Sequence, residues 1–185
     1  MSFKVLVIPE DPTHNGYILK PLVEAILADA GKPNAKVRVL TNPHLNGYDD
    51  AVQAIRNNLE TKYSFCNLWL FMPDADRATP GSMAALEEDL HQKGVRLFCC
   101  PAQSEVEIYA CAAYRDQCEL PWNALRQHPR IKEDIFERIR TTYGNINSAG
   151  GGRTNLITEA LKNLPLLFNL CPELKELRDR IAALV

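Results

Sequence analysis

Five acidic side chains follow apolar segments of the chain. These segments span residues 3–8, 65–72 and 95–100, and each has the length and composition of a β-strand. The acidic residues that come after them are Glu10, Asp74, Asp76, Glu105 and Glu107. Carboxylate oxygens are the ligands that hard divalent cations prefer in proteins. The residue types therefore indicate a site for Mg²⁺ or Mn²⁺.

Each of these acids also has a simpler interpretation as a helix cap or an exposed loop residue. For any single acid the simpler interpretation is the more common outcome, and an Asp-x-Asp motif such as Asp74 and Asp76 is weakly specific alone. The repetition is more informative, because several carboxylates packed together raise one another's pKa unless a cation neutralises them. The group as a whole therefore favours cation binding.

The elements that must position these carboxylates alternate along the first two thirds of the chain. Strand-like segments lie at 3–8, 36–40, 65–72 and 95–100, and helix-like segments lie at 15–30, 48–62 and 82–93, the last with Ser82 as its cap. This alternation predicts an α/β fold with a central four-stranded parallel sheet, in the order 2-1-3-4, flanked by helices. Ligands bind such sheets beyond the carboxyl ends of the strands, where the strand order reverses. Glu10, Asp74 and Asp76 are then expected to face one crevice, with Glu105 and Glu107 beside it.

The chain divides into two parts by composition. Residues 1–118 are predicted to form the α/β core, and residues 119–185 a helical C-terminal extension packed on the same domain. A further helix is expected to start near Ser104, and a final one after Pro172. From residue 122 onward there are ten Lys or Arg against seven Asp or Glu, whereas the whole chain has a net charge of −2. The low net charge argues against a protein that grips long nucleic acid unaided.

Composition sets the broad class of protein. The chain has 185 residues, of which 46% are hydrophobic and 24% charged, as expected of one globular domain. No apolar run reaches membrane-spanning length and the segment 3–8 is too short for a signal peptide, so we expect a cytoplasmic protein without a membrane partner. The six cysteines contain no C-x-x-C pair and the four histidines share no helical spacing, which argues against a zinc site.

Three of these segments together resemble a TOPRIM domain. They are Val5-Leu6-Val7-Ile8-Pro9-Glu10, Leu70-Phe71-Met72-Pro73-Asp74-Ala75-Asp76 and Glu105-Val106-Glu107. More closely, Ser104-Glu105-Val106-Glu107-Ile108-Tyr109 and Leu170-Cys171-Pro172-Glu173-Leu174 resemble a family of small bacterial TOPRIM-like proteins whose members often accompany an ATPase. That family is distantly similar to the OLD-family nucleases.

The resemblance implies phosphodiester cleavage with Mg²⁺ or Mn²⁺. It assigns Asp74 and Asp76 as metal ligands, Glu10 as a ligand or general base, and Glu105 and Glu107 as the completion of a second metal site. Two features depart from the TOPRIM pattern. Asp11 follows Glu10 where TOPRIM proteins usually have glycine, and His14 stands where related nucleases often carry a second acid. These departures bear on how many metal ions the site would hold.

Two arginines are candidates for phosphate binding. Arg153 follows three glycines at the start of a predicted helix, where free backbone N–H groups attract phosphate, although an ordinary flexible loop is an equally good interpretation. Arg77 directly follows the Asp-x-Asp motif. It is placed either to neutralise transition-state charge or to pair with Asp76, and we favour the ion pair.

Two functions follow from these residues. The first is a Mg²⁺-dependent nuclease or related phosphotransfer enzyme that acts on nucleic acid, as the effector of an ATPase-linked defence or repair system. The alternative is a TOPRIM-like module without catalysis, which recognises a partner ATPase or a nucleotide through the same crevice. The low net charge and the altered surroundings of Glu10 favour the alternative.

Overall fold

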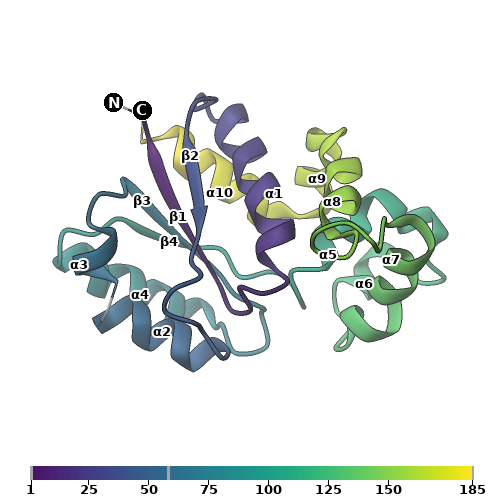
Figure 1. Cartoon of the computed structure of the whole chain (residues 1–185), viewed down its shortest axis with the longest axis horizontal. Coiled ribbons are helices and arrows are strands. Elements are labelled where there is room, and N and C mark those ends of the chain that lie inside the picture. The colour runs from purple at the N-terminus through teal and green to yellow at the C-terminus, as the bar shows by residue number, and fades with distance from the viewer. Residues whose placement is uncertain (1, 58, 185) are drawn as a thin grey trace.

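The computed structural model describes residues 2–57 and 59–184. Its centre is a four-stranded sheet in which every pairing is parallel, in the order β2-β1-β3-β4 (Figure 1). The strands are β1 (Lys4–Pro9), β2 (Lys36–Val39), β3 (Leu68–Met72) and β4 (Leu97–Cys99). The predicted fold class and strand order are therefore confirmed.

The two central strands are buried on both faces. Alternate side chains point to opposite faces of a sheet, so Val7 and Leu70 enter one hydrophobic core while Ile8 and Phe71 enter another. All five residues of β3 are buried, as its uninterrupted apolar sequence predicts. This strand occupies the middle of the sheet and carries the Asp-x-Asp motif at its end.

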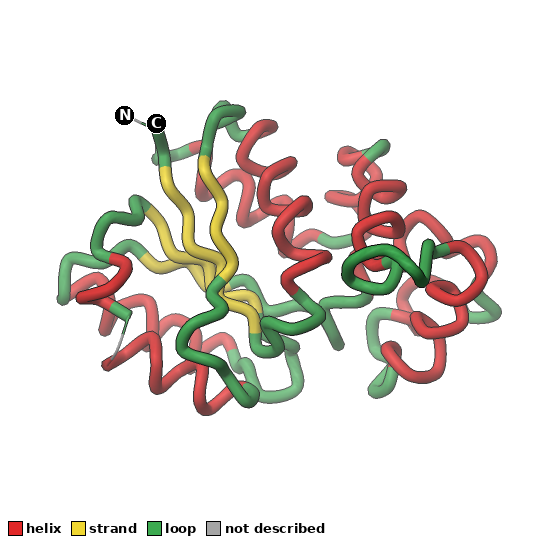
Figure 2. The backbone as a smooth tube through the Cα atoms, viewed as in Figure 1, coloured by secondary structure: helices red, strands yellow, loops and turns green. Residues whose placement is uncertain are grey.

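Helices cover both faces of the sheet (Figures 1 and 2). One face packs against α1 (Gly16–Asp29) and α10 (Pro172–Ala182). The other face packs against α2 (Tyr48–Asn57), α3 (Glu60–Tyr63) and α4 (Pro80–Gln92). Each face of the sheet is therefore shielded from water.

The remaining helices form a lobe beside the carboxyl ends of the strands, on the right of Figure 1. They are α5 (Ile108–Cys111), the 3₁₀ helix η1 (Ala112–Gln117), α6 (Trp122–Leu125), the π-helical turn η2 (Lys132–Phe136), α7 (Glu137–Tyr143), α8 (Arg153–Leu161) and α9 (Leu164–Leu170). Leu156 of α8 and Phe168 of α9 belong to the same hydrophobic core as Val5 of β1. We call this group of helices the helical lobe.

Three details of the sequence prediction are wrong. The expected helix 48–62 is divided into α2 and α3, and position 58 between them lies outside the described residues. The N-cap of α4 is Thr79 rather than Ser82. Ser82 occupies the N3 position of a capping box: its backbone N–H donates to the Thr79 side chain, and its own side chain accepts the Thr79 N–H. No helix starts at Ser104, whose φ of 71° lies in the left-handed region, and the next helix begins at Ile108.

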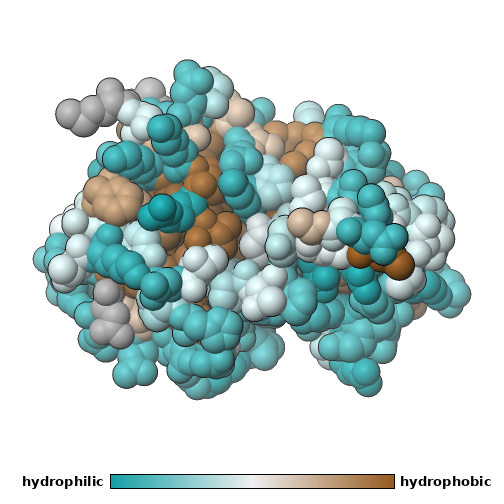
Figure 3. All heavy atoms as spheres, viewed as in Figure 1, coloured by the Kyte–Doolittle hydropathy of each residue, from teal (hydrophilic) through white to brown (hydrophobic). Residues whose placement is uncertain are grey.

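The surface is mostly hydrophilic in the orientation of Figure 3, with apolar side chains visible mainly over the strands. Between residues 2 and 184, leaving out position 58, no helix has both the length and the apolar character that a membrane span requires. All six cysteines are free thiols, and Cys99, Cys100, Cys111 and Cys171 are buried.

Candidate functional site at the carboxyl edge of the sheet

Glu10 and Asp74 meet at the carboxyl edge, as the parallel strands predict. The backbone N–H of Asp74 donates a hydrogen bond to Glu10 Oε2 at 3.2 Å. Asp74 also continues the pairing of β3 beyond the strand, through a parallel bridge to Ala102. The segments that follow β1, β3 and β4 are therefore held side by side at one edge.

The segment after β4 folds over Asp74. The Val106 N–H donates to Asp74 Oδ1 at 2.9 Å, and the Ala75 N–H donates to the Ser104 carbonyl at 2.9 Å. The left-handed φ of Ser104 makes this turn possible, and its hydroxyl donates to the His128 carbonyl at 2.6 Å. One carboxylate oxygen of Asp74 is thus fixed by the backbone of the loop that carries Glu105.

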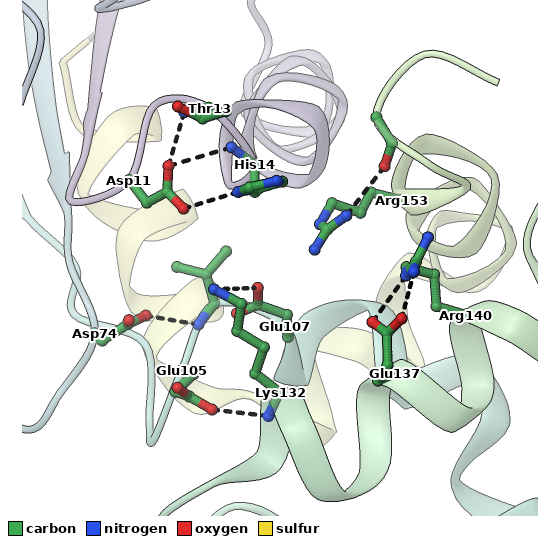
Figure 4. A network of polar contacts seen from close by, with 12 residues as sticks. Asp11, Thr13, His14, Asp74, Glu105, Glu107, Lys132, Glu137, Arg140 and Arg153 are labelled. Atoms are coloured by element: carbon green, nitrogen blue, oxygen red, sulfur yellow. Dashed lines mark hydrogen bonds and ion pairs between the residues drawn. The ribbon is translucent and has the colours of Figure 1, made fainter. Parts of the chain in front are cut away.

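Glu105 and Glu107 both contact Lys132 of the helical lobe (Figure 4). Glu105 Oε2 accepts a hydrogen bond from the Lys132 backbone N–H at 2.8 Å. Glu107 is 1% exposed, and its Oε1 lies 4.0 Å from Lys132 Nζ. Glu107 thus has a basic side chain within ion-pair distance, and the same lysine lowers the pKa of Glu105 through its charge. Lys132 was missed in the sequence because its neighbours resemble an ordinary charged helix face.

Asp76 is exposed, and the ion pair expected between it and Arg77 is wrong. Arg77 Nη1 instead lies 2.8 Å from Asp49 Oδ2, in the first turn of α2, and its guanidinium lies over the ring of Tyr48. The partner comes from an element 28 residues away in the sequence, which local spacing cannot reveal. The negative charge of Asp76 contributes to the raised pKa values of Glu10 and Glu105.

The pKa of Asp74 is raised to about 7. Burial is the largest cause, and the negative charges of Glu107, Glu10 and Glu105 add to it, while the Val106 N–H acts in the opposite direction. Burial is also the main reason why the pKa values of Glu10, Glu105 and Glu107 are raised. Negative charge is therefore concentrated at this edge beyond what the local hydrogen bonds neutralise.

The five carboxylates fall into two groups, which differ in how well they could bind a divalent cation. No ion pair within the described ranges joins Glu10, Asp74 or Asp76 to a basic side chain, so these carboxylates suit a hard cation. Glu105 and Glu107 fit a second ion poorly, because Glu105 accepts the Lys132 backbone N–H and the Lys132 ammonium group already lies beside Glu107. Across residues 2–57 and 59–184, no three His, Cys, Asp or Glu side chains are arranged as a ready-made metal site.

A cavity of about 410 Å³ opens beside the Asp-x-Asp motif. Its wall comes from the sheet edge and from the helical lobe, and includes Asp74, Asp76, Glu105, Arg126 and His128. Access to Asp76 from solvent is therefore open, whereas Glu107 is enclosed.

Arg153 does not lie at the surface. It begins α8 after Gly152, is 7% exposed, and donates through Nη1 to the Gly150 carbonyl at 3.3 Å. Its charge acts on Glu107 and its guanidinium lies over the ring of Phe136. The glycine-rich loop therefore directs Arg153 into the protein interior, next to the acidic edge.

Asp11 and His14 form a turn between Glu10 and α1. Asp11 Oδ1 accepts from the Thr13 N–H at 2.8 Å, and Asp11 Oδ2 lies 3.0 Å from His14 Nδ1 (Figure 4). Although burial opposes the change, these contacts lower the pKa of Asp11. Both residues therefore have a structural role at the start of α1.

Comparison with known proteins gave no relative for this chain. No family model matches it, and neither a curated protein nor a solved structure is significantly similar to it. The geometry of the carboxyl edge and the motif pattern are therefore the basis for a functional proposal.

Proposed function

We propose that the carboxyl edge binds Mg²⁺ or Mn²⁺ and that the protein is a metal-dependent phosphodiester-cleaving or phosphotransfer enzyme acting on nucleic acid. The supporting observation is the concentration of carboxylates around Asp74, whose pKa is raised to about 7 by burial and by three neighbouring acids. A bound cation relieves this repulsion and stabilises the ionised form of each carboxylate.

Glu10, Asp74 and Asp76 are the residues that would hold the ion. When bound, a divalent cation supplies Lewis-acid polarisation of a phosphoryl oxygen and lowers the pKa of coordinated water. Asp76 is exposed beside the 410 Å³ cavity, which gives a substrate a route to this edge. The order of Glu10 and the Asp-x-Asp motif, which resembles that of TOPRIM domains, supports the same assignment. Because the resembled bacterial family often accompanies an ATPase, we propose that the protein acts as the effector of an ATPase-linked defence or repair system.

The test is cleavage of nucleic acid by the purified full chain. Single- and double-stranded DNA and RNA are incubated with the protein and Mg²⁺ or Mn²⁺. We expect Glu10→Gln and Asp74→Asn each to reduce the cleavage rate about 100-fold or more, because each removes a carboxylate ligand of the ion that would stabilise the transition state. Asp89→Asn, an exposed acid of α4 that pairs with Arg56, is the matched control and should cleave like the wild type. Equal cleavage by all four proteins would eliminate the proposed site.

A second candidate is a binding module without catalysis, directed at a partner ATPase or a nucleotide. The observation that favours it is the engagement of the carboxylates by backbone: Glu10, Asp74 and Glu105 each accept an N–H from a neighbouring segment. Calorimetric titration separates the two functions. Binding of Mn²⁺ that is lost in Asp74→Asn supports the enzyme, and no detectable Mn²⁺ binding at millimolar concentration supports the module.

A further inference from the structure

We propose that Lys132 is the resident cation of the Glu105–Glu107 half of the edge, so that the protein binds one divalent ion and excludes a second. The ion that remains is the one assigned above to Glu10, Asp74 and Asp76, and in this respect the inference rests on the proposed function. It departs from the expectation that Glu105 and Glu107 complete a second metal site.

Lys132 contacts both glutamates, Glu105 through its backbone N–H and Glu107 through its ammonium group. Its backbone N–H lies 2.8 Å from Glu105 Oε2 and its ammonium nitrogen 4.0 Å from Glu107 Oε1. Both contacts come from the first residue of η2, so one turn of the helical lobe places a positive charge against the acidic edge (Figure 4). A divalent ion at the same carboxylates would lie close to this ammonium and be repelled by it.

Glu107 is a buried carboxylate that requires a nearby positive charge. A buried carboxylate is costly unless a positive charge or hydrogen bonds compensate for its lost hydration. Glu107 is 1% exposed and its Oε1 accepts no hydrogen bond from the described residues. The positive charges that act on it are those of Lys132 and Arg153.

The carboxylates on the other half of the edge have no such ion pair among the residues that the structure describes. Within the described part of the chain, Glu10, Asp74 and Asp76 form no ion pair with Lys or Arg. Arg77, the nearest candidate in sequence, pairs with Asp49, and its charge acts on Glu10 and Asp76 from beyond ion-pair distance. The two halves therefore differ in whether a basic side chain of the protein lies within ion-pair distance, and the half without one is left to a metal ion.

The test is the stoichiometry of Mn²⁺ binding, measured by electron paramagnetic resonance and by calorimetry on the full chain. We expect one ion for the wild type and two for Lys132→Met, which removes the charge and keeps an apolar stem of similar length. Lys132→Arg keeps the charge and should bind one ion. Lys162→Met removes a lysine that also pairs with a glutamate, Glu159, outside the site, and should bind one ion.

Thermal unfolding gives a second measurement that does not depend on activity. Added Mn²⁺ should raise the melting temperature of Lys132→Met more than that of the wild type, because the ion replaces the missing charge beside Glu107. If Lys132→Met does not fold without metal but folds with Mn²⁺, the inference is supported in the same way.

The outcomes distinguish the inference from the proposed function. Two ions in the wild type, or one in both proteins, overturn the role of Lys132 and leave the proposed function intact. No ion in the wild type and one in Lys132→Met support that role and overturn the proposed function. No ion in either protein overturns both.

Discussion

At the scale of single residues, Asp74 has the most unusual environment in the site. It lies two residues beyond the most buried strand, and burial together with the charges of Glu107, Glu10 and Glu105 raises its pKa to about 7. In the unfolded chain the same group has its ordinary acidic pKa. The folded protein therefore holds this proton more tightly than the unfolded chain does. The contribution of this proton to the free energy of unfolding is fully present at low pH and is lost as the pH rises through about 7.

This difference predicts a pH-dependent effect of Asp74→Asn on the metal-free protein. At pH 8 the variant should be more stable than the wild type by up to about 4 kcal/mol, since each pKa unit corresponds to about 1.4 kcal/mol. Near pH 4 most of this difference should be gone, because Asp74 is then protonated in the folded state and about half protonated in the unfolded chain. Urea unfolding in the presence of a chelator at both pH values measures this difference. Asp76→Asn, at an exposed acid, is the control, and a stability difference for Asp74→Asn that does not change with pH would contradict the prediction.

At the scale of elements, the loop before α8 decides where Arg153 points. Gly150, Gly151 and Gly152 all have positive φ, a conformation that glycine adopts at little cost. A Cβ at Gly152 would lie 3.0 Å from the backbone of Gly144 and of Asn145. The glycines thus allow the loop to pack against the end of α7 and to turn Arg153 inward.

We therefore expect Gly152→Ala to destabilise the fold by about 1–3 kcal/mol, because it combines an unfavourable φ with close backbone contacts. Gly81→Ala is the matched control. A Cβ there meets nothing within 4 Å, and alanine in the first turn of α4 should be neutral or slightly stabilising. Thermal unfolding of both variants measures the effect, and equal stability would mean that the loop relaxes freely.

At the scale of the whole molecule, the last helix ties the C-terminal part of the chain to the sheet. Leu174, Leu177 and Ile181 of α10 are buried in the core that also contains β1. Arg180 Nη2 lies 2.6 Å from Glu87 Oε2, and Glu87 Oε1 accepts the Cys99 N–H of β4. The last helix of the extension is thus part of the layer that covers one face of the sheet.

A chain that ends at Cys171 should consequently lose cooperative folding. Burial of three such side chains contributes roughly 5–9 kcal/mol, which is comparable to the total stability of a typical domain. Circular dichroism during heating should show a broad, weak transition in place of a single sharp one. Lys175→Ala, at an exposed residue of the same helix, should unfold like the wild type. A sharp transition in the shortened chain would show that α10 is dispensable.

The sequence alone determined the α/β class, the strand order and the meeting of Glu10 with Asp74. These features follow from local patterns, since apolar segments of strand length alternate with helices and parallel strands end at one edge of a sheet. The Asp-x-Asp motif lies at that edge because the strand before it is apolar throughout.

Only the tertiary structure decided which charges oppose these acids. Lys132 lies 25 residues from Glu107 and Arg77 lies 28 from Asp49, and no periodicity in the sequence connects either pair. Arg153 has the sequence context of an exposed helix start, but the packing of α8 against α1 and α5 buries it. The charge balance of the site depends on contacts between distant elements, and such contacts are fixed by the packing of the helical lobe on the sheet.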